Sequence, residues 1–380
     1  MRPTFFGMHD GRVTQGSTPD APVGALRFWD SGTSWRELET RPGQFTWSGL
    51  DTAVVAAESV GARPLLVLGQ TPPFHALRPG VESAYGAGAA SMPELGAWRR
   101  YVSAVAKRYG DRIDYQVWNE ANVVNYWAGT PRQMAELTVV ASQSIRQVAP
   151  RATVVAPPFV LRLSGQQDYF TEFWSWQSRG IDLESAVDAV AVNLYPLAEG
   201  LPEAQVELLE QARDVLAMAG VELPVWNTEI NFGLGGGLTP PPISPERQRA
   251  FVLRNFLVNA SLGVQRVYWY RWDLQPIANT LLTTPDFATP TLAGRAFSLV
   301  HDWLNGTRVG PCASTAGVWK CTARAGRQTR TFWWKPNGRP TQMTVRGPGA
   351  SWTDAAGSVT RCPEGCRVTV DESPVMVTSG

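Results

Sequence analysis

Up to about residue 305, the chain alternates between short apolar runs and longer segments with a helical spacing of apolar residues. A short run of β-branched and aromatic residues that is apolar along its whole length is typical of a strand buried on both faces of a sheet. Eight such runs are predicted strands, at residues 4–9, 23–30, 62–69, 113–120, 152–158, 187–196, 223–232 and 264–272.

Helical patterns separate these strands. Ser244, followed by Pro245 and Glu246, is a typical helix start. Strands that alternate with helices predict a parallel sheet covered by helices. Eight strands within roughly 250–300 residues favour a closed (β/α)₈ TIM barrel over an open sheet. No G-x-G-x-x-G motif follows the first strand, which argues against a dinucleotide-binding fold. The predicted helices lie at 48–62, 94–111, 131–150, 203–221 and 244–263.

The pattern changes after residue 305. Residues 306–380 lack a helical period and contain several short runs with the character of strands, such as "TRTFWWK" and "TQMTVRG". These runs predict a small antiparallel β domain, similar to a sandwich. The predicted organisation is therefore a catalytic (β/α)₈ barrel over residues 1–305 and a C-terminal β domain over residues 306–380.

All four cysteines, Cys312, Cys321, Cys362 and Cys366, lie in this C-terminal segment. Four cysteines allow three pairings, and we favour the two local ones, Cys312–Cys321 and Cys362–Cys366. A zinc site is the alternative, but the nearest histidine is His301 and the spacings do not fit a zinc finger or ribbon. Local disulfides favour a secreted or cell-envelope protein, with a cytoplasmic protein as the alternative.

The bulk composition excludes several classes of partner. A net charge of +1 and a charged content of 18% argue against binding to nucleic acid or to an acidic membrane surface. The chain contains no run of 18 apolar residues, so we expect no membrane span. The 16 tryptophans indicate aromatic surfaces that could stack on flat, apolar ligand faces, although we assign about half of them to the core. The sequence does not indicate the oligomeric state.

Candidate chemistry lies at the predicted strand ends, because the active sites of these barrels lie at the carboxyl ends of the strands. The fourth strand ends in "VWNE", which places Glu120 there, and the seventh contains "NTEIN", which places Glu229 there. A single glutamate at a strand end is more often an ion-pair partner than a catalyst. Two carboxylates that face each other across one opening, however, are what glycoside hydrolysis requires.

These motifs carry a family resemblance. "VWNE" and "TE" resemble the acid/base and nucleophile signatures of the clan A glycoside hydrolases, which are retaining (β/α)₈ enzymes. Residues 26–76 resemble glycoside hydrolase family 39 and its relatives, with an arginine-bearing strand, a Trp-rich turn, a "G-x-F-x-W-x-x-L-D" helix entry, and "TP" after the third strand. The resemblance covers about residues 5–300.

The resemblance implies a role for each matching residue. Glu120 would be the general acid/base and Glu229 the nucleophile. Asn119 would bind the sugar hydroxyl beside the reacting carbon. Arg27 would support the nucleophile, and Tyr195 would donate a hydrogen bond to it. No metal ion and no cofactor is expected.

The sequence departs from the family pattern at two positions. Asn193 stands where many relatives have a histidine, and His75 stands where an aromatic residue is usual; both departures bear on the substrate. His9 ends the first strand and is a further candidate for the site. The candidates for stacking on sugar rings are Trp29, Trp35, Trp127, Trp269 and Trp272.

Together these features predict a retaining glycoside hydrolase that cleaves β-type bonds in an oligo- or polysaccharide. A non-catalytic carbohydrate-binding protein on a degenerate barrel is the alternative. An aldolase or isomerase on an unrelated barrel is disfavoured, because neither the seventh nor the eighth predicted strand carries a lysine.

Overall fold

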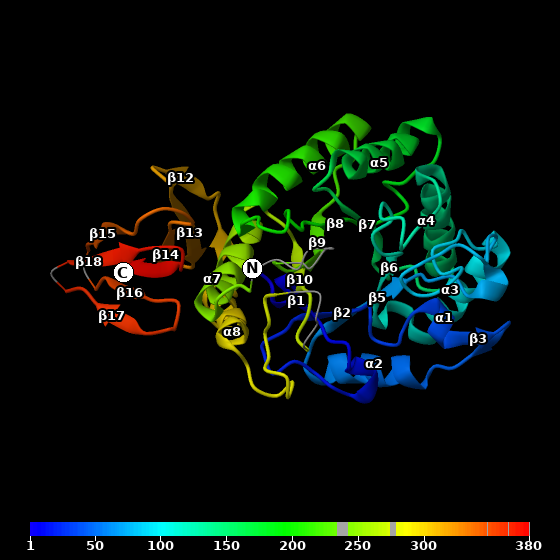
Figure 1. The fold of residues 1–380 in the computed structure, drawn as a ribbon, viewed down its shortest axis with the longest axis horizontal. Helices are drawn as coiled ribbons and strands as arrows, with labels where there is room; N and C mark the ends of the chain where they lie inside the picture. The colour runs from blue at the N-terminus through cyan, green and yellow to red at the C-terminus, as the bar shows by residue number, and fades with distance from the viewer. Residues whose placement is uncertain (234–241, 274–278, 348, 364, 380) are drawn as a thin grey trace.

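The computed structural model describes residues 1–233, 242–273, 279–347, 349–363 and 365–379. Eight parallel strands form a closed barrel in which each strand pairs with the next one along the chain, and β1 closes the ring against β10 (Figure 1). This arrangement confirms the predicted TIM barrel. The barrel strands are β1 (Phe6–His9), β2 (Ala25–Phe28), β5 (Arg63–Leu68), β6 (Asp114–Val117), β7 (Val154–Val160), β8 (Ala189–Asn193), β9 (Val225–Ile230) and β10 (Arg266–Trp269).

Every predicted strand overlaps the corresponding barrel strand, and only β7 extends beyond its predicted end, by two residues. The five predicted helices are present as α2, α3, α4, α6 and α7, whereas α5 and α8 are additional. The short helix α1 (Trp35–Leu38) precedes a small hairpin formed by β3 (Glu39–Arg41) and β4 (Gln44–Phe45). The long helices are α2 (Ser48–Ser59), α3 (Leu95–Tyr109), α4 (Pro131–Arg146), α5 (Ser164–Ser175), α6 (Gln205–Ala219), α7 (Pro245–Ser261) and α8 (Leu292–Leu304).

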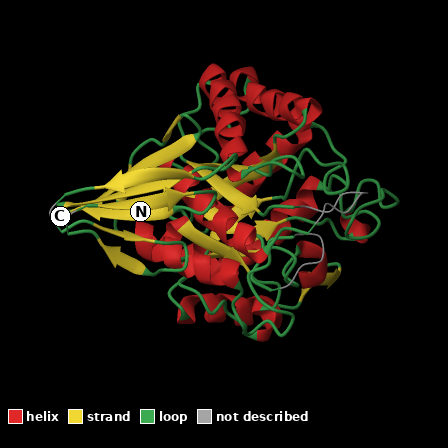
Figure 2. Cartoon of the chain, turned by 60° about the vertical axis from the view of Figure 1, so that its left-hand side comes forward, coloured by secondary structure: helices red, strands yellow, loops and turns green. Residues whose placement is uncertain are grey.

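The helices lie outside the barrel, as Figures 1 and 2 show, and a large apolar core fills the space between them and the strands. A second, smaller apolar cluster fills the inside of the barrel. It includes Ala25, Ala191 and Trp226. Side chains two residues apart on a strand point to the same face. Residues 27, 193 and 228 therefore also point inward, one layer nearer the carboxyl ends of the strands.

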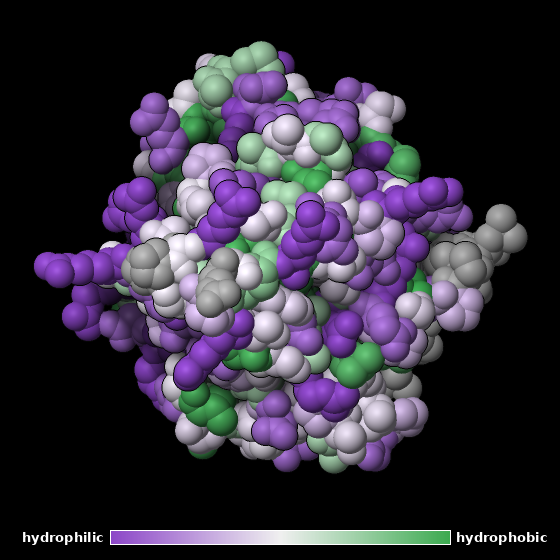
Figure 3. Space-filling view, turned by 90° about the vertical axis from the view of Figure 1, so that its left-hand side faces the viewer, coloured by the Kyte–Doolittle hydropathy of each residue, from purple (hydrophilic) through white to green (hydrophobic). Residues whose placement is uncertain are grey.

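The C-terminal strands form an antiparallel β structure beside α7 and α8 (Figures 1 and 2). A seven-stranded sheet has the order β11-β13-β14-β19-β16-β17, with β12 paired to β13, and β15 pairs with β18. Hydrophilic side chains predominate on the outward face of this region (Figure 3). The strands are β11 (Arg308–Val309), β12 (Ala313–Thr315), β13 (Val318–Ala325), β14 (Gln328–Trp334), β15 (Thr341–Val345), β16 (Ser351–Thr353), β17 (Val359–Arg361), β18 (Cys366–Val370) and β19 (Val375–Ser379).

Both predicted disulfides are present, Cys312–Cys321 and Cys362–Cys366. The C-terminal strands also make direct contacts with the barrel. The guanidinium of Arg330 donates to the carbonyl of Trp303, 2.6 Å away, and the indole of Trp334 donates to Glu203. The division at residues 305 and 306 stays a prediction, because the barrel and the C-terminal strands share one apolar core.

No helix within the described ranges is long and apolar enough to cross a membrane.

Candidate active site

Glu120 and Glu229 lie at the carboxyl end of the barrel. Glu229 is part of β9, and Glu120 follows β6 by three residues. The chain after β6 turns sharply, since Trp118 and Glu120 both have positive φ values, of 61° and 42°. Such left-handed backbone at a residue other than glycine costs on the order of 1 kcal/mol and is concentrated at functional sites. The amide of Trp118 is fixed by a hydrogen bond to the carbonyl of Leu68.

Both glutamates line one cavity of about 540 Å³ at the mouth of the barrel. This volume is within the usual range for a small-molecule site. The lining residues come from loops that follow several different barrel strands, as expected for this end of a TIM barrel. They are Trp29, Asp30, Tyr85, Asn119, Glu120, Tyr126, Arg162, Leu163, Tyr195, Leu197, Ala198, Glu229 and Tyr270.

Glu229 is held by a cation and a phenol. Arg27 Nη1 lies 2.8 Å from Glu229 Oε2, and the Tyr195 hydroxyl donates to Glu229 Oε1 over 3.0 Å. Arg27 is fully buried and also donates to Gln116 and Asn119. Burial raises the pKa of the Tyr195 phenol well above 10, so it stays protonated and remains a donor. Both contacts favour the ionised form of Glu229.

Glu120 has different surroundings. Its carboxylate accepts one hydrogen bond, from Asn193 Nδ2 at 3.0 Å. The hydroxyl of Thr228 donates to Asn193 Oδ1, which orients the amide so that its NH₂ group faces Glu120. No ion pair to Glu120 is present among the described residues, and only 8% of the residue is exposed. Asn193 thus contacts Glu120 but is not among the residues that line the cavity.

The electrostatics of the pair follow from burial and mutual repulsion. Burial, followed by the charge of Glu120, raises the pKa of Glu229 to about 8, while Arg27 and Tyr195 act in the opposite direction. Burial also raises the pKa of Glu120. Two such carboxyl groups lose their protons in separate steps, so the pair holds a single proton over an intermediate range of pH. Because Arg27 and Tyr195 stabilise charge on Glu229, we place this shared proton on Glu120.

A third carboxylate, that of Asp30, also lines the cavity. The hydroxyls of Tyr85 and Tyr270 donate to its two oxygens over 2.7 and 2.6 Å. These three residues were not among the predicted site residues. Asp30 follows β2 by two residues and Tyr270 directly follows β10, so the rule that chemistry lies at strand ends could have found both. Tyr85 lies in a long loop, and the sequence carries no signal for its position.

Several predicted site residues lie elsewhere. Trp127 is buried and its indole donates to Tyr169. Trp269 and Trp272 are buried in the apolar core. The position of these three tryptophans gives no support to a stacking role, because a ring must be accessible to contact a sugar. Among the predicted stacking residues, Trp29 alone is part of the cavity lining.

The two histidines near this end of the barrel contact other protein groups. His75 is paired with Glu39 at 3.2 Å and stacks on Trp35, which is itself buried in the core. His9 is fully buried beside Tyr270 and contacts the carbonyl of Thr228. Neither histidine is among the residues that line the cavity.

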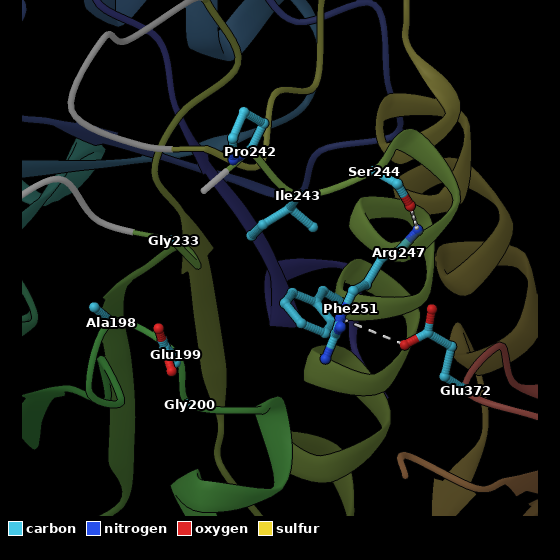
Figure 4. A pocket seen from close by; sticks show the side chains of 10 residues that line it. All are labelled: Ala198, Glu199, Gly200, Gly233, Pro242, Ile243, Ser244, Arg247, Phe251 and Glu372. Atoms are coloured by element: carbon cyan, nitrogen blue, oxygen red, sulfur yellow. Dashed lines mark hydrogen bonds and ion pairs between the residues drawn. The ribbon is translucent and has the colours of Figure 1, made fainter. Parts of the chain in front are cut away.

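A second cavity of about 480 Å³ lies next to the first, and Ala198 lines both. Figure 4 shows Ala198 and Glu199 on one side of this space and Arg247, above the ring of Phe251, on the other. Arg247 is paired with Glu372 of the C-terminal region at 3.5 Å. Residues of the C-terminal region therefore lie close to the mouth of the barrel.

No group of three or more His, Cys, Asp or Glu side chains that could hold a metal ion is found within the described part of the chain.

The fold is a closed (β/α)₈ barrel with an added antiparallel β structure at the C-terminus. The chain is similar in structure to a family 39 glycoside hydrolase from the gut symbiont Bacteroides cellulosilyticus WH2, with a TM-score of 0.76 and 18% identity over 100% of this chain and 81% of the other. It is also similar to a monomeric β-xylosidase from Caulobacter crescentus CB15, with a TM-score of 0.73 and 15% identity over 100% and 97% of the two chains.

A family 30 endoxylanase from Clostridium papyrosolvens C71 has a TM-score of 0.64 and 12% identity, over 98% of this chain and 94% of the other. No protein-family model and no curated protein matches the sequence. At these identities the likeness is one of fold, and it confirms the predicted resemblance to family 39 and clan A barrels.

Proposed function

We propose that this protein is a retaining glycoside hydrolase that cleaves β-type bonds in an oligo- or polysaccharide, with Glu229 as nucleophile and Glu120 as general acid/base. The observation that carries the proposal is the difference between the two carboxyl groups in one cavity. Glu229 contacts Arg27 and Tyr195, whereas Glu120 accepts a single hydrogen bond from an amide. Two carboxyl groups in unlike environments are the usual basis for separate acid and nucleophile roles.

In the first step, the Glu229 carboxylate attacks the anomeric carbon and the glycosidic bond breaks. The departing oxygen takes the proton of Glu120, and a covalent glycosyl-enzyme forms. In the second step, Glu120 removes a proton from water, the resulting oxygen attacks the anomeric carbon, and Glu229 leaves. Two inversions retain the configuration.

The surrounding residues support these steps. Arg27 and Tyr195 keep Glu229 ionised and orient its two oxygens. Asn119 lines the cavity while its Oδ1 accepts from Arg27 at 2.6 Å, so its amide nitrogen is oriented for a sugar hydroxyl. Only 4% of Trp29 is exposed, but the residue lines the cavity, so a sugar ring in the cavity can reach it. A secreted or cell-envelope location remains our proposal, and the two disulfides are compatible with it.

The test is a screen of aryl β-glycosides and then of polysaccharides, followed by proton NMR of the first-formed sugar. The proposal predicts hydrolysis with the β anomer formed first. Initial formation of the α anomer would contradict a retaining mechanism. Binding of sugars without hydrolysis of any substrate would favour the alternative, a non-catalytic carbohydrate-binding barrel.

A further inference from the structure

Arg162 is a charged residue of the cavity that the proposed reaction does not use. It follows β7 by two residues, is half-buried, and lines the same cavity as both glutamates. Within the described part of the chain, its guanidinium makes no hydrogen bond and no ion pair with any protein group. An arginine in a ligand cavity without a protein partner presents its donors to whatever enters.

The other charged residues of the cavity lining differ in this respect. Asp30 accepts from two tyrosine hydroxyls, Glu229 is paired with Arg27, and Glu120 accepts from an amide. Each of these oxygen-bearing groups therefore already has a donor. The unmatched group is a cation, which is free to pair with an anion that enters the cavity.

The position of Arg162 indicates which part of a substrate it would meet. The positive charge of Arg162 lowers the pKa of Glu120, and its effect on Glu120 exceeds that of Arg27. Arg162 is absent from the groups that most affect Glu229. The geometry agrees with this. Arg162 follows β7, which pairs with β6, the strand that precedes Glu120, and the amide of Val160 donates to Asn122 Oδ1 just after Glu120. Arg162 thus lies on the Glu120 side of the cavity. In the proposed reaction, Glu120 protonates the departing oxygen, so this side holds the leaving group.

Apolar surface accompanies the guanidinium. Leu163 and Leu197 line the cavity and are 53% and 61% exposed. Exposed leucines beside a cationic fork suit a sugar that presents C–H groups on its face and an anionic group at its edge. A carboxylate matches the planar fork of a guanidinium with two parallel hydrogen bonds.

We propose that Arg162 binds the carboxylate of an acidic sugar on the leaving-group side of the scissile bond, which makes the substrate an oligo- or polysaccharide that contains uronic acid. This inference rests on the proposed hydrolase function and adds the chemical class of its substrate. It differs from a purely electrostatic role, in which Arg162 adjusts the pKa of Glu120 and affects all substrates alike.

The test uses two aryl glycosides of the same sugar, one with a 4-carboxyphenyl and one with a 4-carbamoylphenyl leaving group. Each variant is compared with the unsubstituted protein on the same substrate, so the different acidities of the two phenols cancel. Arg162→Gln should lower kcat/KM for the 4-carboxyphenyl glycoside about tenfold or more. It should change kcat/KM for the 4-carbamoylphenyl glycoside less than about twofold. For Arg162→Lys, kcat/KM for the 4-carboxyphenyl glycoside should lie between the values for the unsubstituted protein and for Arg162→Gln, because lysine keeps the charge but lacks the planar guanidinium.

Arg99→Gln is the matched control, since Arg99 is an exposed arginine of α3 outside the cavity. Arg99→Gln should leave kcat/KM unchanged for both substrates. High salt should reduce the preference for the carboxylate. Equal losses on both substrates in Arg162→Gln would overturn the proposal and leave only the electrostatic role. A stronger dependence on Arg162 for a 4-sulfophenyl glycoside than for the carboxyphenyl one would overturn the uronic acid assignment in favour of a sulfated sugar.

Equilibrium binding separates this inference from the hydrolase proposal. Calorimetry with uronic acid oligosaccharides and their carboxyl-reduced counterparts needs no turnover. A preference for the acidic form that Arg162→Gln abolishes would support the site even if no glycoside is hydrolysed. Absence of any preference in the unsubstituted protein would overturn the inference even if hydrolysis is observed.

Discussion

The two ends of β6 carry two buried carboxylates with opposite surroundings. Asp114, at the start of the strand, is 1% exposed and is paired with Arg63 and Arg266, each at 2.7 Å. Glu120, beyond the other end, is 8% exposed and accepts one hydrogen bond, from an amide. Two cations neutralise the first carboxylate, and none contacts the second.

This difference separates a structural carboxylate from the proposed acid/base. A buried carboxylate with complete pairing holds strands together, whereas a buried carboxyl with incomplete pairing keeps its proton to higher pH. The burial that raises the pKa of Glu120 has no value for stability, but it leaves a proton available for a departing oxygen. The predictions below test this comparison.

The largest effect is expected at Glu229. Glu229→Ala removes the attacking group, so no glycosyl-enzyme can form. We expect a loss in kcat on the order of 10⁴-fold or more for every substrate, whatever its leaving group. Steady-state kinetics on a good and a poor leaving group check this. A loss confined to poor leaving groups would show that Glu229 is not the nucleophile.

Glu120→Ala should give a loss that depends on the leaving group. For natural sugars, which need protonation, the loss should be about 10²- to 10⁴-fold. For an activated aryl glycoside the first step needs no acid, so a burst of phenol should precede slow turnover as the covalent intermediate accumulates. Stopped-flow measurements detect the burst. A uniform loss over all leaving groups, without a burst, would remove the acid/base role.

At the opposite end of β6, Asp114→Asn should affect stability and not the chemistry. The change removes the negative charge that Arg63 and Arg266 share, and breaking a buried ion pair in this way costs up to about 3 kcal/mol. The pH profile of kcat/KM should stay in place. Asp111→Asn is a matched control at the exposed Arg151–Asp111 pair, where the cost should be below about 1 kcal/mol. A shifted pH profile in Asp114→Asn would show that the two ends are not independent.

Tyr195→Phe should have a smaller effect, with a defined sign. Tyr195 lowers the pKa of Glu229, so its removal raises that pKa. The reaction needs ionised Glu229, and activity is lost as pH falls through the pKa. The acidic limb of the pH profile should therefore move to higher pH, with about a tenfold loss in kcat/KM from the missing hydrogen bond. An unmoved acidic limb would contradict the assigned contact.

The barrel could be predicted because parallel strands buried on both faces are continuous apolar runs, which are visible in a single sequence. Helix α5 could not be predicted from the sequence. Its segment "SGQQDYFTEFWS" contains few apolar positions, and its buried side chains are confined to its second half. Its helical state depends on packing against neighbours, which the local sequence does not record.

Some residues of the site could likewise be predicted from the sequence, and others could not. Arg27, Tyr195 and the two glutamates lie on or directly after strands, so the topology of the barrel fixes where they meet. Trp127 and Trp272 lie outside the cavity lining, which the sequence could not show, because the accessibility of a tryptophan depends on the loops packed over it. Arg162 lies near a strand end and could have been found by the same rule that found Glu120.

The central claim is that Glu229 is the nucleophile and Glu120 the acid/base, and azide rescue of the two alanine variants tests it most directly. With an activated aryl β-glycoside, azide should occupy the space left in Glu120→Ala, attack the covalent intermediate, and give a β-glycosyl azide. In Glu229→Ala, azide should replace the nucleophile and give the α-glycosyl azide. Proton NMR of the two products assigns the anomers. The account predicts opposite anomers from the two variants, and the same anomer from both would contradict it.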